Sequence, residues 1–171
     1  PWEIYKDSHL KPYLETFRET HGRAPGPIVL AESIIVHEDR ERARELTEQY
    51  MGNYFDSVSE FYDLDGGHLK QVKGYENYAK LADATAHMAH EEKRKAYYEL
   101  NLYGTPADVL EKLRARRKLL GHPFDSCLLV DTGAMPQQVT EDMLRLISTK
   151  VLPVFQSWDT DFQPVGRKAE A

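Results

Sequence analysis

Three residues directly after an apolar run could bind a ligand. Asp131, Thr132 and Gly133 follow the run from Phe124 to Val130, which the pattern predicts to be a strand. In folds with parallel strands, ligands meet the loops at the carboxyl ends of the strands. The Thr132 hydroxyl could hydrogen-bond a ligand, and Gly133 would let one approach the backbone closely. The alternative is a plain turn in which Asp131 serves the helix that follows.

A carboxylate also stands inside an apolar run. Glu32 interrupts Ile28–Val36, which is apolar on both faces, as strands of parallel sheets are. A buried carboxyl group has a raised pKa and could exchange protons. It could instead pair with an arginine inside the fold, and we expect this structural role.

Two histidines have a spacing that metal ligands can use. His87 and His90 lie three positions apart on a predicted helix, with Glu91 beside them. A zinc site needs a third and a fourth ligand on an ordered support. The sequence shows neither, so we expect no metal site.

Composition and charge limit the partners. The net charge is −6, and phosphate binding needs clustered Lys and Arg, so we expect no nucleic acid partner. The sequence shows no signal-peptide pattern and no apolar run long enough to cross a membrane, so we expect neither a leader nor a membrane span. Cys127 is the only cysteine and lies in a predicted strand, which predicts a buried, inert thiol in a reducing compartment. We therefore expect a cytoplasmic protein that does not bind membranes.

The elements that must position these residues alternate between helix and strand. Thr105, Pro106 and Asp108 have the pattern of a capped helix start, and Gly121 can end that helix. The strand 124–130 and another helix follow. This order is typical of an α/β fold with a parallel sheet. A closed (β/α)8 barrel needs roughly 250 residues, so the 171-residue chain, which starts at Pro1, is expected to be a fragment of a larger enzyme.

The segment from 65 to 100 is weakly patterned. It has helix-forming residues but a thin apolar stripe. Little core would hold such a segment, so we expect it to be mobile or to act as a cover. Gly66, Gly67 and Gly74 could absorb the backbone change of a moving lid.

Several short motifs in this order carry a resemblance to a known family. They are Glu41–Ser57, Lys73-Gly-Tyr-Glu, Tyr103-Gly-Thr-Pro, Gly133-Ala-Met-Pro136 and Lys150-Val-Leu-Pro153. Together, from about residue 4 to residue 155, they resemble the C-terminal half of the bacterial luciferase-like family of flavin-dependent monooxygenases.

The resemblance implies the C-terminal part of a (β/α)8 TIM barrel, helix-rich with few parallel strands. It would occupy residues 1–157, with 65–100 as a lid insertion and 158–171 as an irregular tail. Such enzymes bind FMN, or the deazaflavin F420 in some relatives. They use reduced flavin and O2 to oxygenate an organic substrate, and NAD(P)H or a partner flavin reductase supplies the electrons.

The resemblance also suggests site residues. Lys73, Gly74, Tyr75 and Tyr78 would belong to the lid over a small, apolar substrate, and Tyr97 and Tyr98 could contribute to it or merely pack. Asp131, Thr132 and Gly133 would contact the cofactor. Most flavin-phosphate contacts of the family lie in earlier strands, so the chain is expected to be inactive alone, and no catalytic residue is assigned.

Two other interpretations stay open. One is a non-catalytic α/β binding module or a degenerate family member. The other is an F420-dependent oxidoreductase of the same fold. A half barrel would leave sheet edges unpaired, so we expect a homo-oligomer.

Overall fold

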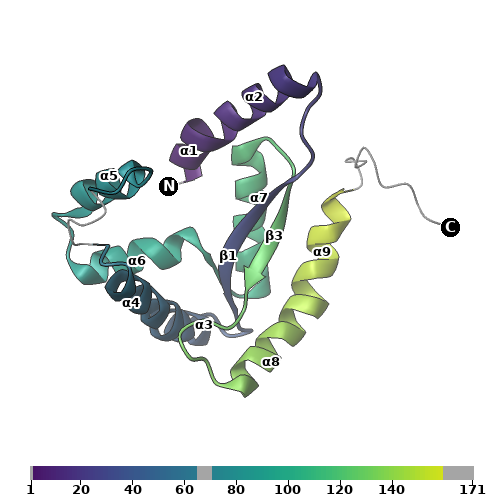
Figure 1. Cartoon of the computed structure of the whole chain (residues 1–171). Helices are drawn as coiled ribbons and strands as arrows, with labels where there is room; N and C mark the ends of the chain where they lie inside the picture. The colour runs from purple at the N-terminus through teal and green to yellow at the C-terminus, as the bar shows by residue number, and fades with distance from the viewer. Residues whose placement is uncertain (1, 65–70, 160–171) are drawn as a thin grey trace.

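The computed structural model describes residues 2–64 and 71–159, and a small parallel sheet lies at its centre (Figure 1). In the described residues the strands are β1 (Ile28–Val36), β2 (Leu102–Gly104) and β3 (Phe124–Leu129), in the order β2-β1-β3. β1 pairs with β3 along its first six residues and with β2 along its last three. The sequence predicts the two longer strands, whereas β2 is too short to show a strand pattern.

Two long helical segments flank β1. The first comprises α1 (Trp2–Tyr5), the π-helical turn η1 (Lys6–Leu10) and α2 (Lys11–His21); the second comprises α3 (Arg40–Leu46), η2 (Thr47–Met51) and α4 (Gly52–Phe61). α2 ends at Gly22, whose φ of 65° is the left-handed conformation that glycine tolerates. Asp39 caps α3, because its carboxylate accepts a hydrogen bond of 2.7 Å from the Arg42 backbone N–H.

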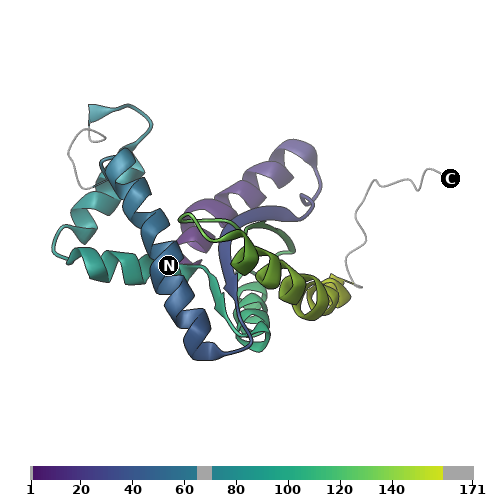
Figure 2. The same ribbon diagram turned by 90° about the horizontal axis from the view of Figure 1, so that it is seen from below.

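The weakly patterned segment also folds into helices. α5 spans Glu76–Thr85 and α6 spans His90–Leu100. Figures 1 and 2 show α4, α5 and α6 grouped on one side of the sheet, away from α8 (Gln137–Leu146) and α9 (Leu152–Gln156). The proposed hinge residues Gly66 and Gly67 lie outside the described residues.

The last part of the chain follows the predicted order. α7 (Pro106–Leu120) joins β2 to β3, and α8 continues through the π-helical turn η4 (Ile147–Val151) into α9 and the short turn η5 (Ser157–Asp159). Thr105 and Asp108 form the predicted capping box at the start of α7. The predicted tail from residue 158 lies outside the described residues from residue 160 onward.

One face of the sheet is buried against α7. Leu30, Glu32 and Ile34 belong to this face and are almost fully buried. The Glu32 carboxylate is in direct contact with the Arg116 guanidinium of α7. The predicted pairing of Glu32 with an arginine is therefore confirmed.

The opposite face is open along the first half of β1. Ala31 pairs with Cys127 in the parallel register, so both side chains point to this face. Val29 is 66% exposed and Leu129 is 41% exposed. The prediction of a buried thiol is wrong, because Cys127 is exposed on this open face. An apolar run predicts burial on both sides, but α7 covers only one side of β3.

The structure is a helix-rich α/β fold with few parallel strands, as the sequence predicts. Its strand order differs from that of a barrel, in which each strand pairs with the next along the chain. Here β1 lies between β2 and β3, so the structure does not show a barrel. Within the described part of the chain, no helix combines the length and the apolar character needed to cross a membrane.

Candidate functional site

An apolar cavity of about 220 Å³ lies among α4, α5 and α6. Its walls are mostly carbon, and its described lining residues are Phe55, Ser59, Leu64, Tyr78, Ala82, Thr85, Met88, Lys93, Ala96, Tyr97 and Leu100. Ligand sites are typically concave and apolar, with a few polar groups that fix orientation. This cavity is therefore the candidate site.

Tyr97 fixes the position of α6 against the sheet. Its hydroxyl lies 3.3 Å from Ser33 Oγ of β1, and its ring lies 5.4 Å from that of Phe55 on α4. Asn101 continues the link, since its Oδ1 accepts from the Ser33 backbone N–H at 2.9 Å and its Nδ2 donates to the Tyr97 carbonyl. Burial raises the pKa of Tyr97, so the phenol stays neutral at physiological pH.

Arg94 holds α6 close to the long helix α3–η2–α4. Its guanidinium lies 3.1 Å from the Asp56 carboxylate and donates to the Glu48 carbonyl at 3.2 Å. Gly52 makes room for it, because a Cβ at this position would overlap with the guanidinium. Arg94 thus joins α6 to both α4 and η2.

Among the described lining residues, one buried polar atom has no partner. Ser59 Oγ on α4 is buried and makes no hydrogen bond. Thr85 and Lys93, which also line the cavity, both have interactions of their own. Buried polar groups are usually hydrogen-bonded, so Ser59 is the group in this wall that a ligand could satisfy.

The structure brings only part of the predicted lid to the cavity. Tyr78 lines it, whereas Lys73, Gly74 and Tyr75 lie in the exposed turn before α5 and are not among its lining residues. The ring of Tyr75 lies 5.7 Å from that of Tyr78. Of the other two candidate tyrosines, Tyr97 lines the cavity, and Tyr98 packs edge-on against Tyr103 instead.

The turn at Asp131–Gly133 has a structural reason for its glycine. Gly133 has a φ of 68°, and a Cβ there would overlap with the Tyr50 carbonyl of η2. Thr132 is 6% exposed, while Asp131 is exposed. The close approach predicted at Gly133 is thus made by the protein's own backbone. The role of this turn in cofactor binding stays a prediction.

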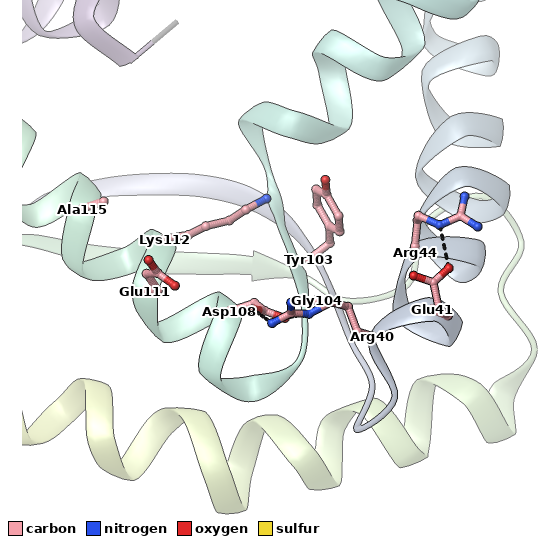
Figure 3. Close-up of a pocket in the computed structure, with 9 residues that line it drawn as sticks. All are labelled: Arg40, Glu41, Arg44, Tyr103, Gly104, Asp108, Glu111, Lys112 and Ala115. Carbon is pink, nitrogen blue, oxygen red and sulfur yellow. Dashed lines mark hydrogen bonds and ion pairs between the residues drawn. The ribbon is translucent and has the colours of Figure 1, made fainter.

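A second, charged groove of about 540 Å³ runs between α3 and α7 beside β2 (Figure 3). Its lining residues are Arg40, Glu41, Arg44, Tyr103, Gly104, Asp108, Glu111, Lys112 and Ala115. Arg40 lies 2.6 Å from Asp108, and Arg44 binds both Glu41, at 3.2 Å, and Glu48, at 2.6 Å. The Arg40–Asp108 pair joins α3 to α7, whereas the two Arg44 pairs lie within the α3–η2 segment. Both arginines are therefore already engaged.

Lys112 and Tyr103 form the floor of the groove. The Lys112 ammonium lies 3.6 Å from the centre of the Tyr103 ring and donates to the Asn101 carbonyl at 3.3 Å. Burial lowers the pKa of Lys112. The pKa of Tyr103 lies well above its ordinary value, because the ring is partly buried and the Tyr103 hydroxyl donates a hydrogen bond to Glu99. The sequence gives no signal for this groove, because its residues meet only when α3 and α7 pack.

A flavin phosphate does not fit the turn or the groove. Phosphate sites use free backbone N–H groups at a helix start or cations without partners. At Gly133 the close space is filled by the Tyr50 carbonyl. In the groove Arg40 and Arg44 already bind carboxylates, and the Lys112 ammonium is held by the Tyr103 ring and the Asn101 carbonyl. The described residues of the turn and the groove therefore offer no cradle for the phosphate of FMN or F420.

The histidine pair does not form a metal site in the described residues. His90 Nε2 lies 2.8 Å from Asp56 Oδ1. Among residues 2–64 and 71–159, no group of three or more His, Cys, Asp or Glu side chains could hold a metal ion.

Comparison with solved structures shows a likeness of fold. No family model matches the sequence, and no curated protein matches it. Among solved structures, the chain is similar to the monooxygenase RslO1 from Streptomyces bottropensis, with a TM-score of 0.52 and 21% sequence identity. The match covers 91% of this chain and 39% of that one. The likeness shows the fold alone.

Proposed function

We propose that this chain is the C-terminal part of a luciferase-like, flavin-dependent monooxygenase, with a β2-β1-β3 strand order that departs from the family's (β/α)8 barrel. Within it, the cavity among α4, α5 and α6 would hold a small apolar organic substrate. The observation that carries the proposal is the cavity itself: it is apolar, and Tyr78 and Tyr97 line it in the segment predicted to cover a ligand.

The fold likeness supports this proposal. RslO1 is a monooxygenase, and this chain spans 39% of its length, as expected of one part of a larger enzyme. The open sheet face with Val29, Ala31 and Cys127 lies opposite α7. In a barrel, whose helices surround the strands, this face would point inward.

The chemistry divides between the cofactor and the protein. When bound, a reduced flavin would supply the oxygen chemistry with O2. This chain would bind the substrate and exclude water, because oxygenation is wasted when water enters the site. The described turn and groove do not fit a flavin phosphate, so residues outside them would hold the cofactor. Electrons would come from NAD(P)H or a partner reductase.

Two titrations of the 171-residue chain test the proposal. Isopropylbenzene should change the tyrosine fluorescence saturably, because Tyr78 and Tyr97 line the cavity. FMN should bind weakly or not at all up to high micromolar concentration. Saturable FMN binding without any response to isopropylbenzene would contradict the proposal.

The poor fit to a flavin phosphate favours a second candidate, a non-catalytic binding module that takes the same apolar ligand. An oxygenation assay of the full-length gene product with reduced FMN or reduced F420 separates the two. Product formation would support the enzyme, and ligand binding without turnover would support the module.

A further inference from the structure

We propose that the cavity among α4, α5 and α6 takes a neutral molecule with one six-membered ring and one carbonyl oxygen, which accepts a hydrogen bond from Ser59. The small aromatic ketones represent this class. The inference rests on the proposed function for its assumption that the cavity is the substrate site, and it adds the chemical class of the occupant.

The volume sets the size of the occupant. The cavity encloses about 220 Å³, and a closed apolar cavity of about 150 Å³ already accommodates benzene. One ring with a short substituent therefore fits.

The lining sets its charge. Phe55, Tyr97 and Leu100 present mostly carbon to the cavity. Transfer of an ionised group into such apolar surroundings is unfavourable unless an opposite charge lies beside it. Lys93 at the wall already has an interaction of its own. A neutral ligand is therefore expected.

Ser59 sets the position of the oxygen. Its hydroxyl is buried and without a partner, which is unusual for a serine in a helix. Ser57, two positions earlier on α4, shows the common arrangement, since its Oγ donates to the Asn53 carbonyl at 2.9 Å. A ligand carbonyl has acceptor lone pairs and no donor, so it matches the free O–H of Ser59.

A matched pair of ligands and a matched pair of variants test this assignment. Acetophenone and isopropylbenzene have nearly the same shape, but only acetophenone has an acceptor oxygen. Their dissociation constants can be measured by NMR titration of the full 171-residue chain, as wild type, Ser59→Ala and Ser57→Ala. The Ser57→Ala variant removes an exposed hydroxyl of the same helix and is the control.

Ser59→Ala should reduce the ratio of the acetophenone affinity to the isopropylbenzene affinity about three- to tenfold relative to the wild type, as expected for loss of one hydrogen bond. Ser57→Ala should leave this ratio unchanged. An unchanged ratio in Ser59→Ala, with both ligands still bound, would overturn the carbonyl assignment and leave the proposed function standing. If neither ligand binds the wild type, both proposals fail. Alanine is the strongest helix former, so Ser59→Ala is expected to keep α4 folded and the comparison valid.

Discussion

Glu32 and Arg116 place two opposite charges in the core, where they are 2% and 5% exposed. Arg116 also donates to the Leu100 carbonyl at 3.0 Å and lies over the Trp2 ring. Ser126 adds a contact to the Glu32 carboxylate. The pair thus connects β1, α7, β3 and the N-terminal helix through charged groups rather than carbon alone.

Removing one member of the Glu32–Arg116 pair should strongly lower the unfolding free energy. Glu32→Gln leaves the Arg116 charge buried without its counter-ion, which typically costs about 3–5 kcal/mol of unfolding free energy. Replacing both residues with methionine should cost less than the two single replacements added together. Urea unfolding measures these differences, and a loss below about 1 kcal/mol for Glu32→Gln would contradict this role.

Asp108 links stability to pH. Burial alone would raise the pKa of its carboxyl group, but hydrogen bonds from Thr105 and the Arg40 guanidinium outweigh burial and lower it below 3.8. A carboxyl group with a lowered folded-state pKa stabilises the fold above its unfolded pKa and loses this effect as pH falls through the folded value. Asp108→Asn should therefore be less stable than the wild type at pH 7. The difference in unfolding free energy between the two proteins should become smaller below pH 3.8. Unfolding curves that differ equally at pH 7 and pH 3 would exclude this linkage.

Sequence reasoning finds residues whose roles are local. The capping box at Thr105 and Asp108 and the arginine partner of Glu32 follow from pattern and charge. Ser59 and Arg94 could not be found this way, because their surroundings exist only when α4 meets α6. Cys127 was assigned wrongly for the same reason, since its exposure depends on which sheet face is covered.

At the scale of elements, the β3–α8 turn is shaped by its contact with η2. Gly133 and Gly121 both have positive φ, 68° and 63°, but only a Cβ at Gly133 would meet a neighbour, the Tyr50 carbonyl. Gly121→Ala should cost about 1–2 kcal/mol for the left-handed backbone. Gly133→Ala should cost roughly 1–3 kcal/mol more through overpacking.

Thermal or urea unfolding of the two variants makes the comparison. Equal losses of unfolding free energy in the two variants would mean that η2 moves easily to accommodate a Cβ at position 133. The structural reason for glycine at 133 would then fail, and the predicted ligand approach at Asp131–Gly133 would gain support.

The segment from 65 to 100 shows which structural features the hydrophobic pattern can predict and which it cannot. Its helix-forming residues correctly indicate α5 and α6, and its thin apolar stripe indicates that little core holds it. The cavity itself could not be predicted, since Phe55 and Ser59 of α4 form one wall and lie outside the segment.

At the scale of the whole molecule, the strand order is the feature that most needs a test. β3 pairs with β1, and Ala31 lies opposite Cys127 on the open face. In a barrel order β2 would stand between these strands, and the two residues would lie too far apart for a disulfide.

Introducing one cysteine makes the order measurable. Under mild oxidation Ala31→Cys should form an intramolecular disulfide with Cys127, the only native cysteine. Val29→Cys is the control. Position 29 pairs with Asp125, two residues before Cys127 along β3, so this cysteine should lie too far from Cys127 and keep its thiol. Mass spectrometry and thiol titration report the outcome. Free thiols in oxidised Ala31→Cys would contradict the β2-β1-β3 order and favour a barrel-like arrangement.

The central claim is that the cavity among α4, α5 and α6 is a ligand site, and a crystal structure of the chain soaked with acetophenone tests it most directly. The ring should lie in the cavity beside Phe55 and Tyr97, with the ketone oxygen within hydrogen-bonding distance of Ser59 Oγ. Acetophenone bound instead on the open sheet face around Val29 and Leu129, with the cavity empty, would contradict it.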